Sequence, residues 1–338
     1  MSAPLTRRAA LKSAAILPAA ALRSGAADSP VTVGLIGSGS RGSSVAEAMA
    51  KNTPARFTAF CDLVDTRMAR AASRTGSEKP AFYNDYRRLL ESNVDAVIIA
   101  TPVYLHPEHF EAAVKAGKHI YIEKPAGIDV EGCKRIIRAA DSADRKFNIM
   151  FGFQRRYAPP YRRAYEAVAS GAIGPIQLAL ARFLKSEGAA AQARRTPLTE
   201  KEKLQNWYVW RQYSGDLIVE NNIHSIDILN WFLGGNPVSA IGTGGTRTPG
   251  EGDTRDHNLV VFTYADGTKA QLSGATIAPP GYREVSEQFF GAKAMIETSE
   301  NQIRYRYSSG NEKEEMMSRN MTINAEEELD KRTARNRP

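Results

Sequence analysis

The 338-residue chain contains only two cysteines, Cys61 and Cys133. Two thiolates are too few for a structural zinc site, and we predict no metal site. A buried thiol is the default for each cysteine, since sequence alone does not bring them together as a disulfide. No internal repeat is present, and no element combines clustered basic residues with aromatic ones. The sequence therefore indicates no nucleic-acid interface.

Long hydrophobic runs are also lacking. The apolar stretch from about Ala9 to Leu22 is shorter than the ~20 residues that a membrane-spanning helix requires, so no membrane span is predicted. It follows the adjacent Arg7 and Arg8 and ends in small residues, which is typical of a twin-arginine signal peptide. We expect residues 1–27 to be this signal and the protein to be periplasmic or otherwise extracytoplasmic. An Ala-rich amphipathic helix that stays attached is the alternative.

The formal net charge of +8 is concentrated at the two ends of the chain. Residues 1–27 hold four basic residues and no acidic one, and the last eight residues form another basic cluster. The body of the chain is therefore close to neutral. Residues 325–338 resemble the opening of a polar helix with nothing apolar after it, so we expect the C-terminus to be incomplete.

Strand and helix patterns alternate through residues 28–150. Apolar runs lie at 31–36, 57–61, 95–100 and 118–122, and helical patterns lie at 41–51, 66–74, 106–116 and 129–145. This alternation is typical of a parallel sheet with helices on both faces. We predict an α/β chain whose first part is a domain with a parallel sheet of the Rossmann type.

The pattern changes in residues 151–338. Helices are expected at 159–171 and 216–233, and alternating runs occur at 177–184, 257–264, 269–275, 286–291, 293–298 and 302–307. Residues 185–205 and 243–256 lack apolar periodicity and are expected to be long loops. We predict a second, α+β domain with an open, mainly antiparallel sheet that serves substrate binding and oligomerisation.

A glycine-rich turn follows the first apolar run, in the sequence "VTVGLIGSGSRG". Gly37 permits a tight turn, Gly39 lets the backbone approach a pyrophosphate, and Gly42 lets the next helix pack on the strand. Asp62 ends the second apolar run, where a carboxylate accepts the ribose hydroxyls of NAD; the alternative is an N-cap. NADP remains possible because Arg41 or Arg67 lies within reach of a phosphate.

The third and fourth apolar runs end in "TPVYLHPEHF" and "EKP". Thr101 and Pro102 are predicted to lie at the carboxyl edge of the sheet, where dinucleotides bind. His106 and His109 have no nearby carboxylate suited to a metal site, so a packing role is favoured for both. Lys124 has a charge that suits a developing alkoxide or a sugar hydroxyl; in isolation, a surface lysine paired with Glu123 is the simpler interpretation.

A third group lies in "GDLIVENNIHSIDILNWFLGG". On one helix, Glu220, His224, Asp227 and Trp231 share a face, and the other faces are apolar. The polar face should therefore line a cavity or be internally paired. His224 has the pKa range for taking a proton from a hydroxyl, with Glu220 holding its tautomer or binding substrate. A buried histidine paired with Asp227 is equally compatible with the pattern.

Taken together, these motifs and the stretch "FQRRYAPPYRRAYEAVASGAIGPI" resemble the Gfo/Idh/MocA oxidoreductase family over residues 31 to about 310. The resemblance implies a Rossmann domain that binds NAD or NADP, an open sheet that often forms an oligomer interface, and sugar or cyclitol substrates. It implies that Lys124 contacts the substrate and the nicotinamide ribose and that His224 transfers the proton. The chain departs from the family at Glu220, which replaces an aspartate, and at Asn222, which replaces a glycine.

The predicted site follows from these observations. Lys124, His224 and Glu220 are the expected catalytic residues. The expected cofactor-binding residues are Gly37, Ser38, Gly39, Ser40, Arg41, Gly42, Asp62, Thr101, Pro102, His106, Glu123, Lys124 and Gln154.

Three functions remain open at this stage. The leading hypothesis is an exported, homo-oligomeric oxidoreductase that transfers hydride between a sugar or polyol carbon and a retained NAD. A redox-neutral, NAD-dependent glycosidase or lyase is the second. A non-catalytic nucleotide- or sugar-binding protein is the third.

Overall fold

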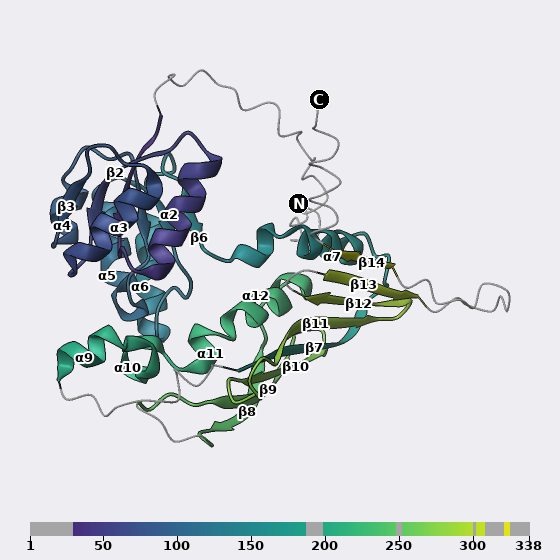
Figure 1. The fold of residues 1–338 in the computed structure, drawn as a ribbon. Coiled ribbons are helices and arrows are strands. Elements are labelled where there is room, and N and C mark those ends of the chain that lie inside the picture. Colours follow the sequence, from purple (N-terminus) through teal and green to yellow (C-terminus); the bar gives the residue numbers. More distant parts are fainter. Residues whose placement is uncertain (1–29, 187–198, 248–251, 300–301, 308–320, 325–338) are drawn as a thin grey trace, which may run out of the picture.

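The computed structural model describes residues 30–186, 199–247, 252–299, 302–307 and 321–324. The predicted signal peptide at 1–27 and the polar helix expected at 325–338 lie outside these residues. The described chain forms two β-sheets, which occupy different ends of the molecule (Figure 1). None of the helices in the described ranges has the length and apolar character needed to cross a membrane.

The first sheet has six parallel strands in the order β3-β2-β1-β4-β5-β6. Their bounds are β1 Thr32–Ile36, β2 Arg56–Cys61, β3 Ala81–Tyr83, β4 Ala96–Ile99, β5 His119–Ile122 and β6 Ile149–Phe151. The central strands are almost entirely buried, as expected for a parallel sheet covered on both faces. The strand order reverses between β1 and β4, which is the position where nucleotides bind in such sheets.

Helices α2 to α6 connect these strands. They are α2 Ser40–Asn52, α3 Asp65–Thr75, α4 Tyr86–Leu90, α5 His106–Lys115 and α6 Val130–Ser142. Local sequence explains several of their ends. Gly76 ends α3 in the left-handed conformation, and the Asp129 carboxylate caps α6 by accepting the Gly132 N–H. The predicted Rossmann sheet is confirmed, but the sequence analysis missed the short β3, β6 and α4.

The second sheet has eight strands in the order β14-β13-β12-β11-β7-β10-β9-β8, antiparallel except for the pair β7 and β10. The strands are β7 Ile176–Lys185, β8 Ser239–Gly245, β9 His257–Thr263, β10 Lys269–Ala275, β11 Arg283–Gly291, β12 Ala294–Ser299, β13 Gln302–Tyr307 and β14 Met321–Asn324. The prediction of an open, mainly antiparallel sheet is confirmed. The sequence analysis missed β8 and β14, and β8 extends into the stretch expected to be a loop.

Helices α7 Pro159–Ala169, α11 Leu217–Glu220 and α12 Ile223–Phe232 pack on one face of this sheet. The remaining short elements are α9 Glu200–Gln205, α10 Arg211–Ser214 and the 3-10 turns η2 Val103–Leu105, η3 Gln154–Tyr157 and η4 Trp207–Val209, and α10 contacts η2 and η4. A capping box between Thr199 and Glu202 starts α9, within a segment that was expected to be a loop. The helix expected at 216–233 is instead two helices, α11 and α12, separated at Asn221 and Asn222.

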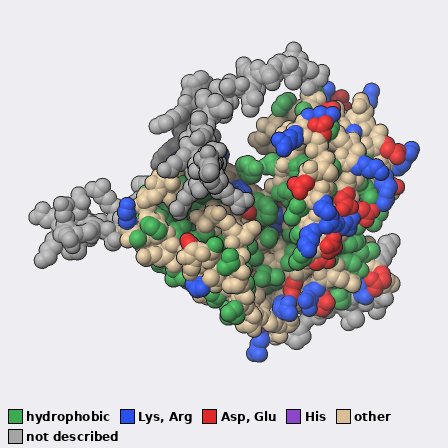
Figure 2. Space-filling model, turned by 180° about the vertical axis from the view of Figure 1, so that it is seen from behind, with side chains coloured by type: hydrophobic (Ala, Val, Ile, Leu, Met, Phe, Trp, Pro, Cys, Tyr) green, Lys and Arg blue, Asp and Glu red, His purple; other side chains and the backbone are tan. Residues whose placement is uncertain are grey.

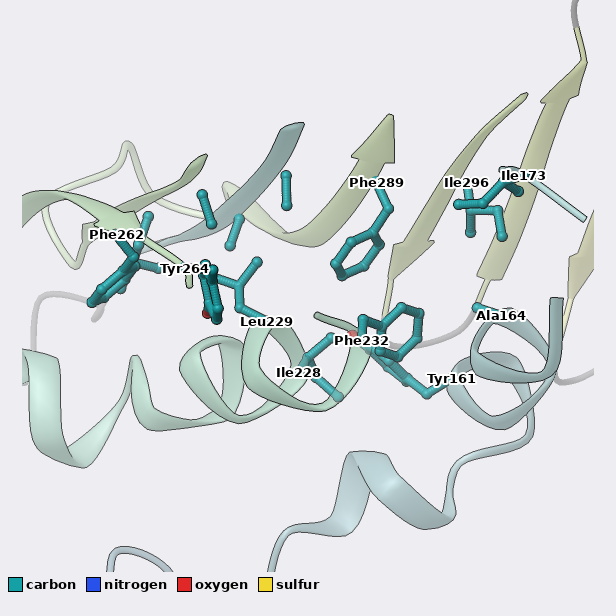
Figure 3. Packing of buried hydrophobic residues seen from close by; sticks show 14 of the residues in the cluster. Tyr161, Ala164, Ile173, Ile228, Leu229, Phe232, Phe262, Tyr264, Phe289 and Ile296 are labelled. Carbon is teal, nitrogen blue, oxygen red and sulfur yellow. The ribbon is translucent and has the colours of Figure 1, made fainter. Parts of the chain in front are cut away.

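Aromatic and aliphatic side chains fill the space between α7, α12 and the sheet (Figure 3). Phe232 of α12 stacks on Phe289 of β11, with 4.4 Å between the ring centroids. Tyr161 of α7 is completely buried beside them. Because α12 carries His224 at its first turn, this packing holds the histidine in place relative to the sheet.

A buried ion pair lies at the edge of this core. Arg155 in η3 donates to the Glu287 carboxylate of β11 at 2.8 Å, and Tyr161 donates to the other carboxylate oxygen at 2.9 Å. Ser225 of α12 also donates to Glu287, at 2.8 Å. The pair therefore joins the segment that leaves the first sheet to a strand of the second and to α12.

We predict that Arg155→Met destabilises the protein by about 3–5 kcal/mol, because Glu287 then stays buried without its cation. Chemical denaturation measures this difference. Arg304→Ala is the matched control, since Arg304 pairs with Glu297 at the surface and its loss should cost less than about 1 kcal/mol. Equal losses in the two variants would contradict the prediction.

Candidate active site

The glycine turn has the geometry expected of a nucleotide loop. Gly37 has a φ of +93°, and a Cβ atom on it would lie 2.6 Å from the Ala100 carbonyl carbon. A Cβ on Gly42 would lie 2.0 Å from the Gly37 oxygen. Both positions therefore require glycine, the first for its backbone conformation and the second for the close approach of α2 to the turn.

The start of α2 is open toward the outside of the sheet. A Cβ on Gly39 would meet no atom within 4 Å, and no side chain caps the helix at this residue. The first amides of α2, from Ser40 and Arg41 onward, therefore point to open space with the positive end of the helix dipole behind them. The turn fits the pyrophosphate of a dinucleotide.

Asp62 lies directly beside this turn. Its carboxylate accepts the Ser38 N–H at 3.0 Å and the Val64 N–H at 3.0 Å. The alternative interpretation of Asp62 as the N-cap of the next helix is wrong, because Val64 is the N-cap of α3 and no side chain caps it. Asp62 is a carboxylate held at the carboxyl end of β2, where a ribose would reach it. The Arg67 guanidinium lies 3.7 Å from the same carboxylate, so the basic residue considered for NADP is in place.

Thr101 and Pro102 follow β4 at the carboxyl edge of the sheet. Two histidines form hydrogen bonds with Thr101. His106 contacts the Thr101 carbonyl oxygen at 3.0 Å and the Pro125 carbonyl oxygen at 2.6 Å. His109 bonds the Thr101 hydroxyl at 3.1 Å. Both rings are buried, and burial lowers the pKa of His109 to about 4. The packing role expected for both histidines agrees with these contacts, while contact of His106 with a cofactor stays a prediction.

Glu123 is the centre of a polar cluster that the sequence did not reveal. Its Oε1 accepts hydrogen bonds from Tyr121 at 2.9 Å and from Arg41 Nε at 2.9 Å. Arg41 also donates to Gln154 at 3.1 Å, so it reaches from α2 across the ends of β5 and β6. Glu123 is therefore paired with Arg41, not with Lys124 as the simpler interpretation held. Its Oε2 is buried without a partner and is available to a ligand hydroxyl or amide.

Lys124 and Glu220 meet across the two sheets. The Lys124 ammonium donates to the Glu220 carbonyl oxygen at 2.7 Å and to its Oε1 at 2.8 Å. Both side chains are largely buried, with 14% and 12% of their surface exposed. Burial raises the pKa of Glu220, and the Lys124 charge acts in the opposite direction. The remaining oxygen, Oε2, is buried and unpaired.

His224 lies one turn after Glu220, close enough to Lys124 for the lysine charge to act on it. Burial, followed by the charges of Lys124, Arg155 and Arg41, lowers the pKa of His224 to about 2. The imidazole is therefore neutral at any pH near 7. The pKa lies far below the range that the sequence analysis expected for a base that takes a proton from a hydroxyl, because burial and the nearby cations disfavour the imidazolium. Its Nδ1 is buried and makes no hydrogen bond. Glu220 does not hold its tautomer, because the glutamate side chain is turned to Lys124.

Other polar residues of this helix face serve packing. Asp227 accepts a two-pronged hydrogen bond from Arg156, so it is not the partner of His224 that the buried-histidine alternative required. Trp231 stacks on Tyr165 with centroids 4.5 Å apart. Asn222 is fully buried and accepts from Asn258 at 2.7 Å, opposite Gly274, where a Cβ would lie 2.4 Å from the Asn222 oxygen.

Several residues near the site were not predicted. Tyr121 orients Glu123, and Arg155 contributes to the field at His224. Lys185 at the end of β7 donates to Asn221 at 3.0 Å, and Tyr208 bonds the same amide. The alternation of side chains along β5 could have predicted that Tyr121 lies on the same face as Glu123. No local sequence pattern predicts that Arg155, Lys185 or Tyr208 lies near the site. Among the described residues, no cluster of three or more potential metal ligands occurs.

Family profiles match both parts of the chain. Residues 31–151 match the Gfo/Idh/MocA profile described as an oxidoreductase family with an NAD-binding Rossmann fold. Residues 161–297 match the C-terminal domain of the same family. Both matches lie in the order that the motifs indicated.

Characterised relatives are similar over most of their length. An inositol 2-dehydrogenase of Rhizobium meliloti is 27% identical over 80% of this chain and 76% of its own. The myo-inositol 2-dehydrogenase of Thermotoga maritima is 27% identical over 78% of this chain and 74% of its own.

Solved structures agree with the fold. A levoglucosan dehydrogenase in complex with NADH and levoglucosan aligns with a TM-score of 0.75 at 22% identity, covering 88% of this chain and 80% of that one. The myo-inositol 2-dehydrogenase from Lactobacillus plantarum aligns with a TM-score of 0.67 at 26% identity, covering 80% and 76%. With a nucleotide turn of the required shape and both domains matched, the chain belongs to the Gfo/Idh/MocA family and is an NAD-dependent oxidoreductase.

Proposed function

We propose that this protein is an exported oxidoreductase that transfers hydride between a carbon of a sugar or polyol and a tightly held NAD. The observation that carries the proposal is the meeting of Lys124, Glu220 and His224 at the carboxyl edge of the nucleotide-binding sheet. The inositol and levoglucosan dehydrogenases among its relatives support a polyhydroxylated substrate.

The buried, unpaired atoms of the site suit such a substrate. Glu123 Oε2 and Glu220 Oε2 accept hydrogen bonds, and hydroxyl groups donate them. Lys124 uses two of its three N–H donors on Glu220, so one remains for a substrate oxygen. Glu123 and Lys124 follow β5, whereas Glu220 lies on α11. Together they orient more than one hydroxyl of a ring.

Bound NAD supplies a hydride acceptor. The protein residues then handle the proton and the oxygen. As the C–H bond breaks and the carbonyl double bond forms, the hydroxyl proton passes to neutral His224, which its lowered pKa makes a weak base. Lys124 stabilises the oxygen as negative charge develops on it. Glu220 holds Lys124 at two points and sets the direction of the remaining N–H.

Export through a twin-arginine signal is proposed from Arg7, Arg8 and the apolar stretch after them. Such signals export proteins that are already folded, so the cofactor is exported together with the protein. Outside the cytoplasm, the protein cannot draw on a pool of free cofactor. Tight retention follows as part of the same proposal, with a second substrate that re-oxidises the cofactor.

We test the function on purified protein with two measurements. Mass spectrometry after denaturation should release NAD or NADH without any addition, and a panel of myo-inositol, levoglucosan and glucose should change the nicotinamide absorbance. Lys124→Met and His224→Ala should each lower turnover by about 10²–10⁴-fold and retain the nucleotide. Lys146→Met is the control, since Lys146 is exposed and pairs with Asp144 at the surface of the first domain.

Unchanged turnover in both variants would contradict the assigned roles. Release of an aglycone with no net change in nicotinamide absorbance would instead favour the redox-neutral glycosidase or lyase. Protein that is isolated free of nucleotide and binds it weakly would remove tight retention while leaving hydride transfer possible.

The buried histidine also predicts a pH dependence of stability. The pKa of His224 is about 2 in the folded protein and near 6.5 when unfolded, so the unfolded chain binds the extra proton between these values. Stability is therefore lost as pH falls below about 6.5. When the pH is lowered from 7.5 to 5.0, the free energy of unfolding of His224→Gln should fall by about 2 kcal/mol less than that of the wild type. Urea denaturation at the two pH values measures this difference. Equal losses would refute the prediction.

We also propose that the second sheet joins two copies of the chain. Its outward face carries exposed apolar side chains, among them Ile241, Leu259 and Val261, and Ile241 pairs with Val261 across β8 and β9. Figure 2 shows this end of the molecule with few charged side chains, while Lys, Arg, Asp and Glu crowd the end with the parallel sheet.

Ile241→Asp should convert the protein to a monomer, because a carboxylate cannot be buried unpaired in such an interface. Light scattering should then give the molar mass of one chain. Val130→Asp is the control, since Val130 is also an exposed apolar residue but lies on α6 in the first domain. The same mass for the Ile241 variant and the wild type would argue against this interface.

A further inference from the structure

Asp216 has an unusual backbone for an aspartate. Its φ is +87° and its ψ is 170°, a region that glycine adopts readily and other residues rarely do. Within the described ranges it is the only non-glycine residue with a positive φ. It is also buried, with 4% of its surface exposed. A conformation of this kind persists only where surrounding contacts enforce it.

Two arginines from other segments hold the Asp216 side chain. Arg255 donates its backbone N–H to Oδ1 at 2.7 Å and its guanidinium to Oδ2 at 2.7 Å. Arg211 Nε lies 3.4 Å from Oδ2. Oδ1 also accepts the Leu217 N–H at 2.8 Å, at the first residue of α11. Both carboxylate oxygens are thus used to fix the start of this helix.

The Asp216 main chain then sets the position of Glu220. The Asp216 carbonyl oxygen accepts the Glu220 N–H at 2.9 Å, so the single turn of α11 is closed by these two residues. Glu220 presents its carbonyl oxygen and its carboxylate to Lys124 from the other end of that turn. The neighbouring Gly215 packs closely on the Ile128 carbonyl, in the loop that follows Lys124.

We propose that Asp216 is a positioning residue. Held by Arg255, it keeps the turn of α11 in the conformation that places the Glu220 carbonyl oxygen and Oε1 against the Lys124 ammonium. Asp216 does not contact the reacting atoms and acts only through Glu220. The inference deepens the proposed function, because it identifies what orients Lys124, but its geometry does not depend on which substrate is turned over.

The first test reads Lys124 directly. The full chain is made with ¹³C- and ¹⁵N-labelled lysine, which leaves all three N–H donors of Lys124 in place, and the Lys124 signal is identified by its loss in Lys124→Arg. We expect Asp216→Ala and Arg255→Ala to move this signal in the direction seen in Glu220→Gln. Asp216→Gly should move it less, because glycine keeps the backbone conformation without strain. Arg304→Ala and Asp266→Ala, which remove a surface ion pair and a turn cap elsewhere, should leave it in place.

The second test is a double-mutant cycle on turnover of the best substrate of the panel. Asp216→Ala should lower kcat by about 10- to 100-fold with little change in nucleotide content. In a Glu220→Gln background the same substitution should change kcat by less than about twofold, since its effect passes through Glu220. A purely structural role would give the same loss in both backgrounds.

The two measurements separate the two ideas. An unmoved Lys124 signal in both Asp216→Ala and Arg255→Ala overturns the positioning role, as does an additive cycle. A moved signal with no turnover of any polyol supports the positioning role and counts against the proposed substrate class. Arg255 is half exposed, so its variant remains informative if Asp216→Ala does not fold.

Discussion

The buried pair between Lys124 and Glu220 is the constraint on which the site depends. It joins the end of a strand in the parallel sheet to a single helical turn above the other sheet, and neither group reaches the other from within its own domain. Removing two charges from water is costly unless their geometry is good. Here the lysine donates to both the carboxylate and the carbonyl of one residue, which provides that geometry. The pair also makes the surroundings of His224 depend on both domains.

A second buried pair supports the first. Arg155 and Glu287 join the chain leaving β6 to β11, and Ser225 of the histidine-bearing helix shares the same carboxylate. Arg155 therefore stabilises the junction and adds positive charge near His224. The neutral imidazole is a consequence of burial and of these cations together, not of any residue in its own sequence neighbourhood.

Much of this protein was predictable from local patterns. The glycine turn, Asp62 and the parallel strands follow from spacing and periodicity, because strand burial and turn conformation depend on neighbouring residues. The short elements β3, β6 and α4 escaped, since three to five residues carry too little periodicity. The split between α11 and α12 was not predicted either, because helical spacing continues through Asn221 and Asn222, where the Asn222 N–H bonds instead to the Leu217 carbonyl five residues earlier.

By itself, the sequence determined the two-domain order, the nucleotide turn and the identity of the residues that carry charge. Only the tertiary structure decided how those charges pair. Glu123 faces Arg41, Glu220 faces Lys124 and Asp227 faces Arg156. Spacing alone favoured pairing Glu123 with Lys124 and left a pairing of Asp227 with His224 open. The physical reason is that a helical or strand period fixes the direction of a side chain, while its partner is selected by packing between elements distant in sequence.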